Sequence, residues 1–180
     1  PDLHAVPQGL FRQDSSHQFN ATGLLNFEDG RFKAAISNWF DFDNDGRRDL
    51  LFAYHEHPSF RPWWQFFKEA NKGRPEKWHV VLYRNVGDAN HWLQIRLVGP
   101  AGNRQGIGAR VTVLTQSGQQ TQEVGGSDGA FFSQGHYRLY FGLGNDHQID
   151  AIRIRWSDGF TQELKDVVGD RLMVLRRESA

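Results

Sequence analysis

The sequence predicts an all-β protein whose C-terminal half is an antiparallel β-sandwich. Three observations predict this fold. Apolar residues occupy every second position in several short segments, turn signals separate these segments, and the chain combines 19 glycines with 13% aromatic residues. A period of two gives a strand one buried face, and several short strands separated by turns are typical of a sandwich.

The strands of the sandwich are predicted from this alternation. Leu93, Ile95 and Leu97 alternate with Gln94 and Arg96, and the same pattern recurs further along the chain. Turns rich in Gly, Pro, Ser and Asp punctuate the pattern, because these residues tolerate turn conformations. The complete set of expected strands is 93–97, 110–113, 119–124, 137–143, 152–156, 160–164 and 172–176.

The segment 55–79 differs, because it is dense in aromatic residues and histidine. One short helix is expected over residues 62–71, since Pro62 suits a first helical position and Gly73 could follow the end. Aromatic rings here could stack on sugars or anchor a partner, or they could cover an open sheet edge. The residues assigned to this candidate binding surface are Trp63, Trp64, Phe67 and Trp78.

Composition excludes several classes of function. The formal net charge is +0, which argues against a nucleic-acid partner, because phosphate binding needs a basic excess. Without cysteine there is no disulfide, thiolate metal site or cysteine nucleophile. No apolar run approaches the roughly 20 residues that span a bilayer. Ser-His-Asp catalysis stays open, but no Gly-x-Ser-x-Gly motif supports it, so we assign no catalytic residue.

Four aspartates lie within the nine residues 41–49 and would repel one another unless a cation neutralised them. A hard divalent ion meets this need, and Ca²⁺ accepts six to eight oxygen ligands at flexible geometry. Gly46 allows the sharp turn that such a loop requires. The sequence therefore predicts one calcium ion as cofactor, held by Asp41, Asp43, Asp45, the carbonyl of Arg47, and Asp49.

The acidic loop and the histidines near it admit other interpretations. An EF-hand needs glutamate at position 12 of the loop, where this chain has Phe52 within an apparent strand. An acidic surface turn is the plainest alternative, and Mg²⁺ is disfavoured because it demands strict octahedral geometry. His55, His57 and His79 could bind a metal, although a solvated loop is the preferred interpretation.

Two stretches resemble known families. Residues 38–52, which contain the acidic loop, resemble the FG-GAP/VCBS repeat, the calcium-binding blade of integrin-type β-propellers. Residues 82–88 and 10–14 resemble the strand and turn that end such a blade. From residue 90 onward the chain is similar to the ASPIC/UnbV domain, on segments 90–97, 106–111, 141–144 and 155–159. Their order resembles the C-terminal part of the cartilage acidic protein 1-like family.

These resemblances imply a blade-like FG-GAP/VCBS repeat at residues 1–88, with the aromatic insert 55–79, packed with an ASPIC/UnbV β-sandwich at 89–177. They imply a secreted, extracellular or periplasmic protein, of which this chain is expected to be a C-terminal fragment. A single blade leaves sheet edges exposed, which could pair with a second copy.

Two functions follow as hypotheses. The preferred one is a calcium-stabilised extracellular interaction module that binds a carbohydrate or a protein, with adhesion as its role. The alternative is an enzyme or accessory factor of secondary metabolism, which the resemblance to UnbV-type domains suggests. A deep pocket lined by acids or histidines with shifted pKa values would favour the alternative.

Overall fold

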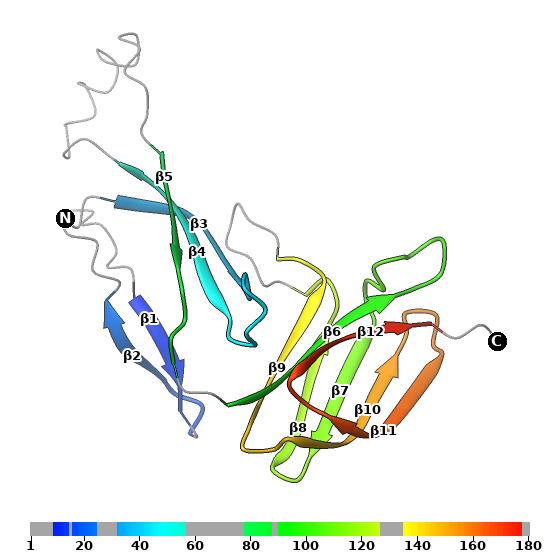
Figure 1. Cartoon of the computed structure of the whole chain (residues 1–180). Helices are drawn as coiled ribbons and strands as arrows, with labels where there is room; N and C mark the ends of the chain where they lie inside the picture. The colour runs from blue at the N-terminus through cyan, green and yellow to red at the C-terminus, as the bar shows by residue number, and fades with distance from the viewer. Residues whose placement is uncertain are drawn as a thin grey trace. The chain divides into compact units, whose positions relative to one another are not determined.

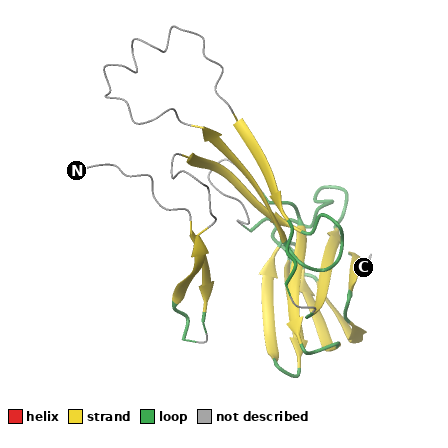
Figure 2. Cartoon of the chain, turned by 60° about the vertical axis from the view of Figure 1, so that its left-hand side comes forward, coloured by secondary structure: helices red, strands yellow, loops and turns green. Residues whose placement is uncertain are grey.

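The structure is a computed structural model that describes residues 9–14, 16–24, 32–56, 78–87, 90–126 and 135–177 (Figure 1). Regular structure in these ranges consists of β-strands, without a helix (Figure 2), so the predicted all-β fold is confirmed. The same ranges contain no apolar helix long enough to cross a bilayer. The helix expected over 62–71 lies outside the described residues.

One four-stranded antiparallel sheet, in the order β11-β10-β7-β8, forms half of the C-terminal region. Its alternating apolar residues face each other across the strands: Ile152 lies opposite Val113, and Ile154 lies opposite Val111. Such pairs of β-branched side chains stabilise neighbouring strands by packing on one face. The strands are β7 (Arg110–Thr115), β8 (Gly118–Glu123), β10 (Gln148–Arg155) and β11 (Thr161–Val168).

A second sheet has three strands in the order β12-β6-β9. The β6 and β9 strands are antiparallel, whereas β12 runs parallel to β6, which departs from the purely antiparallel expectation. Parallel neighbours need a long crossover connection, and here the other sandwich strands supply it, because they lie between β6 and β12 in the chain. The strands are β6 (His91–Val98), β9 (Arg138–Gly144) and β12 (Arg171–Arg176).

Both sheets contribute to one hydrophobic core, an arrangement consistent with the predicted sandwich. Leu93 and Ile95 of β6 are fully buried, as are Ile152 of β10 and Val111 of β7. Every predicted strand of this region is confirmed, with ends that differ by a few residues. Gln94 is the exception to the alternating pattern: it lies among the polar positions of β6, yet only 1% of it is exposed. The acidic loop explains this burial, as described below.

The N-terminal residues form two further sheets. A hairpin pairs β1 (Gly9–Gln13) with β2 (Phe19–Leu24) in antiparallel register. A three-stranded sheet follows in the order β3-β4-β5, built from β3 (Phe32–Phe40), β4 (Asp49–Glu56) and β5 (Trp78–Tyr83). The acidic loop connects β3 to β4.

The chain divides into two compact units. The first is Pro1–Ser37 with Phe52–Val81, and the second is Asn38–Leu51 with Leu82–Ala180. The acidic loop therefore lies in the same unit as the C-terminal strands, so its contacts with these strands are internal to one unit.

Candidate functional site

The acidic loop leaves β3 at Asp41 and enters β4 at Asp49, and both of these carboxylates are buried, with 4% and 0% of the residue exposed. Between them the backbone turns sharply, with φ of +59° at Asn44 and +89° at Gly46. Asparagine and glycine tolerate the left-handed region better than other residues, so the local sequence favours this turn.

Asp41 accepts hydrogen bonds both from the loop and from β6. Its Oδ1 accepts the N–H of Asp45 at 3.1 Å, and its Oδ2 accepts the N–H of Gly46 at 2.8 Å. The same Oδ2 accepts a hydrogen bond from Gln94 Nε2 at 2.5 Å. Gln94 Oε1 in turn accepts Arg138 Nη1 at 2.9 Å. This chain of bonds ties the loop to β6 and β9 and explains why Gln94 is buried.

Asp49 connects the loop to the segment that follows β5. Its Oδ2 accepts the N–H of Phe42 at 3.0 Å, and its Oδ1 accepts the N–H of Asn85 at 2.8 Å. The side chain of Asn85 also donates to the carbonyl of Arg48 at 3.3 Å. A buried carboxylate is costly unless its oxygens are hydrogen-bonded, and these donors meet that need.

Three of the predicted ligands come together. One carboxylate oxygen each of Asp41, Asp43 and Asp49 lies within 4.8 Å of the other two. Three carboxylates in one small volume form a hard, all-oxygen donor set, which suits Ca²⁺ or Mg²⁺ rather than a softer metal. The residues therefore fit the ion that the sequence predicts.

Asp45 and Arg47 are placed differently. Both carboxylate oxygens of Asp45 bond to Arg47, Oδ1 to the backbone N–H and Oδ2 to the guanidinium. Arg84 Nη2 lies 2.8 Å from Asp43 Oδ2 and 3.6 Å from Asp45 Oδ2. Desolvation opposes ionisation of Asp45, but the Arg47 hydrogen bonds and the charges of Arg47 and Arg84 outweigh it and lower its pKa. Asp45 is thus oriented toward arginine rather than toward the other three carboxylates.

A groove of about 380 Å³ adjoins the loop within the same unit. Trp92 lies closest to the turn, because a methyl group on Gly46 would lie 2.2 Å from its indole Nε1. Partial burial raises the pKa of Tyr140, whose hydroxyl lies 2.5 Å from His136 Nε2. The described lining contains no carboxylate; it comprises Gly46, Arg47, Arg48, Asn85, Gly87, Asn90, His91, Trp92, Leu93, Gln94, Tyr140, Phe141 and Gly142.

The candidate partner-binding aromatic side chains lie outside the described part of the chain. Trp63, Trp64 and Phe67 lie outside the described residues. Trp78 begins β5, and only its backbone is described. Their assignment to a binding surface therefore stays a prediction.

Sequence reasoning missed the residues that hold the loop in place. Asn85 lies 36 positions along the chain from its loop partner Asp49, and Gln94 lies 53 positions from Asp41. Arg138 lies 94 positions from Asn44. No local pattern marks such pairs. Gln94 occupies a position where the alternation of β6 predicts an exposed side chain, so nothing in the local sequence indicated its contact with the loop.

A search of curated proteins found no match to this chain. The family model described as ASPIC and UnbV matches residues 99–180, a segment that includes all strands from β7 to β12. An ASPIC/UnbV domain is therefore present at residues 99–180.

Proposed function

We propose that this chain is a calcium-stabilised extracellular interaction module, in which the acidic loop holds the ion and the module binds a carbohydrate or a protein. One observation carries the calcium part: oxygens of Asp41, Asp43 and Asp49 lie within 4.8 Å of one another, and two of these residues are buried. Bound Ca²⁺ supplies positive charge that offsets the mutual repulsion of these carboxylates.

The contacts of the loop support a structural role for the ion. Asp41 bonds to Gln94 of β6, and Asp49 bonds to the backbone of Asn85. Fixing these two carboxylates fixes the loop against the strands that begin the sandwich. Arg84 now pairs with Asp43 from a side chain that is 56% exposed. An exposed ion pair contributes little, so Arg84 would give way to a divalent ion at small cost.

The groove beside Trp92 supports binding of a partner more than it supports an enzyme. Its described lining offers aromatic rings and N–H donors, such as Trp92, Arg47 and Asn85, but no carboxylate. Rings and donors of this kind contact sugars and protein surfaces. Hydrolysis of a glycoside would need a pair of carboxylates.

Thermal melting with and without calcium tests the ion. At free Ca²⁺ of about 100 times the dissociation constant, binding should stabilise the fold by about 2.7 kcal/mol. Chelation should therefore lower the melting temperature. Asp43→Ala should remove most of this difference, because it deletes one of the three clustered carboxylates, and Asp43 is the exposed one, whose loss disturbs the fold least. Equal melting temperatures in calcium and in chelator would refute the site. Mg²⁺ at the same concentration serves as the ion control.

Binding to an array of extracellular glycans tests the partner. We expect specific binding that Trp63→Ala or Trp64→Ala removes, since loss of a stacked ring costs a sugar its main apolar contact. Phe11→Ala, which changes an exposed aromatic residue of the β1–β2 hairpin, is the matched control. Binding that both tryptophan variants retain would exclude the aromatic insert as the carbohydrate surface.

A further inference from the structure

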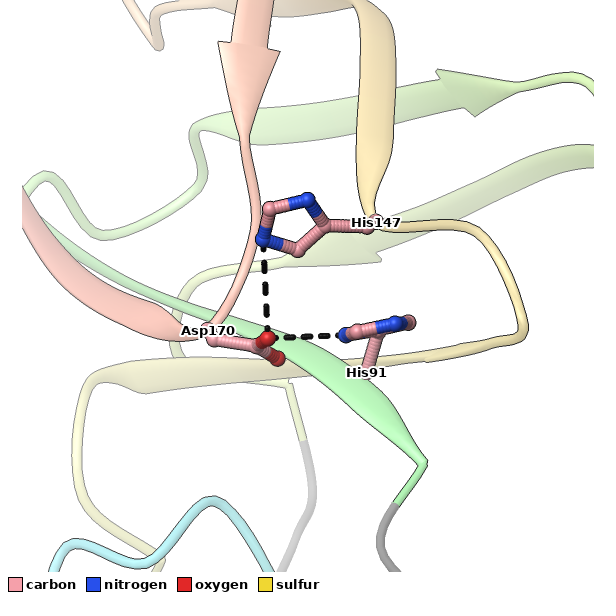
Figure 3. A group of neighbouring side chains, drawn as sticks. All are labelled: His91, His147 and Asp170. Carbon is pink, nitrogen blue, oxygen red and sulfur yellow. Dashed lines mark hydrogen bonds and ion pairs between the residues drawn. The ribbon is translucent and has the colours of Figure 1, made fainter.

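A second group of metal-ligating side chains lies away from the acidic loop. One nitrogen each of His91 and His147 and one oxygen of Asp170 lie within 4.8 Å of one another. Both contacts in Figure 3 end on the same atom, Asp170 Oδ2: His91 Nδ1 lies at 2.7 Å and His147 Nε2 at 3.6 Å. The two imidazole rings are themselves close, with centroids 4.8 Å apart.

The three residues come from different parts of the sandwich. His91 is the first residue of β6, His147 precedes β10, and Asp170 lies in the turn between β11 and β12. Since β6 and β12 belong to one sheet and β10 and β11 to the other, the group joins segments from both sheets.

Backbone hydrogen bonds hold these segments together independently of the side chains. The N–H of Asp170 donates to the carbonyl of Trp92 at 2.6 Å, and the N–H of Gly169 donates to the carbonyl of His147 at 2.8 Å. Asp170 Oδ1 accepts the N–H of Trp92 at 3.1 Å. One oxygen of this carboxylate is therefore anchored, and the other is directed at both imidazoles.

Gly169 permits the close approach. A methyl group at this position would lie 3.0 Å from Leu143 Cδ1 and 3.2 Å from the carbonyl oxygens of both His147 and Trp92. Asp170 adopts φ of +55°, a conformation that aspartate tolerates better than most residues. The local sequence thus allows three ligand-bearing segments to meet at one point.

The electrostatics suit a ligand carboxylate. Partial burial opposes ionisation of Asp170, but the hydrogen bonds from His91 and the Trp92 N–H, with the charges of both histidines, outweigh it and lower its pKa. The side chains of His91, His147 and Asp170 are 38%, 53% and 38% exposed, so an ion can reach them from solvent.

We propose that His91, His147 and Asp170 form a zinc site, with water in the fourth position. Two imidazoles and one carboxylate are a donor set that Zn²⁺ prefers, whereas Ca²⁺ prefers oxygen alone. Tetrahedral ligands at about 2.0–2.2 Å from zinc lie about 3.4 Å apart. The spacing of 3.6 Å between Asp170 and His147 already fits, and the 2.7 Å hydrogen bond to His91 must open slightly.

Zinc at this point would cross-link the two sheets where their connecting turns converge. The anchored Oδ1 of Asp170 acts as a positioning contact, comparable to the outer-shell hydrogen bonds that orient ligands in metal sites. The water in the fourth position would be accessible to solvent, so a carboxylate or imidazole of a partner could replace it as the fourth ligand.

Calorimetric titration with Zn²⁺ tests the site, on tag-free protein saturated with Ca²⁺ so that the acidic loop does not compete. The titration is run about one pH unit above the ordinary imidazole pKa, because zinc binds the neutral form of imidazole. We expect saturable binding of one zinc ion and a higher melting temperature with zinc. His147→Ala and Asp170→Asn should each weaken binding by at least about tenfold, the loss typical even of an outer-shell partner.

Control variants separate this site from other histidines. His17→Asn removes an exposed imidazole in the β1–β2 hairpin and should leave zinc affinity unchanged. Cobalt(II) bound in place of zinc should show the visible absorption of a tetrahedral ion in the parent protein and lose it in Asp170→Asn. The proposal is overturned if zinc does not bind saturably, if both ligand variants keep the parent affinity, or if only His55→Ala and His79→Ala lose it.

Discussion

Replacing Asp49 with alanine is expected to lower the free energy of unfolding by about 3–5 kcal/mol, because Asp49 accepts two hydrogen bonds and a hydrogen bond to a charged group contributes about 1.5–3 kcal/mol. The side chain is fully buried and accepts the N–H groups of Phe42 and Asn85. Alanine would remove both of these hydrogen bonds at once. The variant also removes one of the three clustered carboxylates, so its remaining stability should no longer respond to calcium.

Urea unfolding followed by tryptophan fluorescence, in calcium and in chelator, measures this effect. Asp150→Ala is the matched control, because Asp150 is exposed on β10 and its loss should change stability by no more than about 0.5 kcal/mol. If Asp49→Ala unfolded at the same urea concentration as Asp150→Ala, the bonds from Phe42 and Asn85 would not stabilise the protein as inferred.

Gly46→Ala is expected to destabilise the protein by about 2–5 kcal/mol for two separate reasons. Position 46 has φ of +89°, where a side chain adds backbone strain of about 1–2 kcal/mol. The new methyl group would also lie 2.2 Å from Trp92 Nε1, so the indole must move, and overpacking of this kind costs about 1–3 kcal/mol. Because the N–H of Gly46 also bonds to Asp41, the displaced turn should weaken binding at the proposed calcium site too.

Gly142→Ala provides the comparison. It lines the same groove, but a methyl group there meets nothing within 4 Å, so stability should change little. Urea unfolding of both variants gives the difference, and the fluorescence of Trp92 should change only in Gly46→Ala. Equal stabilities would show that Trp92 does not lie against the turn.

The sandwich was predictable because its signal is local. Buried Leu93 and Ile95, like Ile152 and Ile154, alternate with polar residues within a few positions, and a strand's period of two requires nothing more. The parallel pairing of β12 with β6 was not predictable in this way. Alternation fixes which side chains are buried, but it contains no information about the direction of a distant neighbour.

The same distinction applies to the acidic loop. The meeting of Asp41, Asp43 and Asp49 follows from their spacing on a tight turn, whereas the bond from Gln94 to Asp41 joins residues 53 positions apart. Asp45 is instructive, because its competing partner is Arg47, only two residues away. The group of His91, His147 and Asp170 had no local signal, since three distant segments of the chain bring it together.

The position of β12 has a consequence for biosynthesis. It is the last strand of the sandwich to be made, yet it pairs with β6, the first, which has β9 on its other side. During translation one edge of β6 therefore stays open until residues 171–176 have left the ribosome. A nascent chain that stalls before β12 presents an unpaired edge of β6 to chaperones or to neighbouring chains.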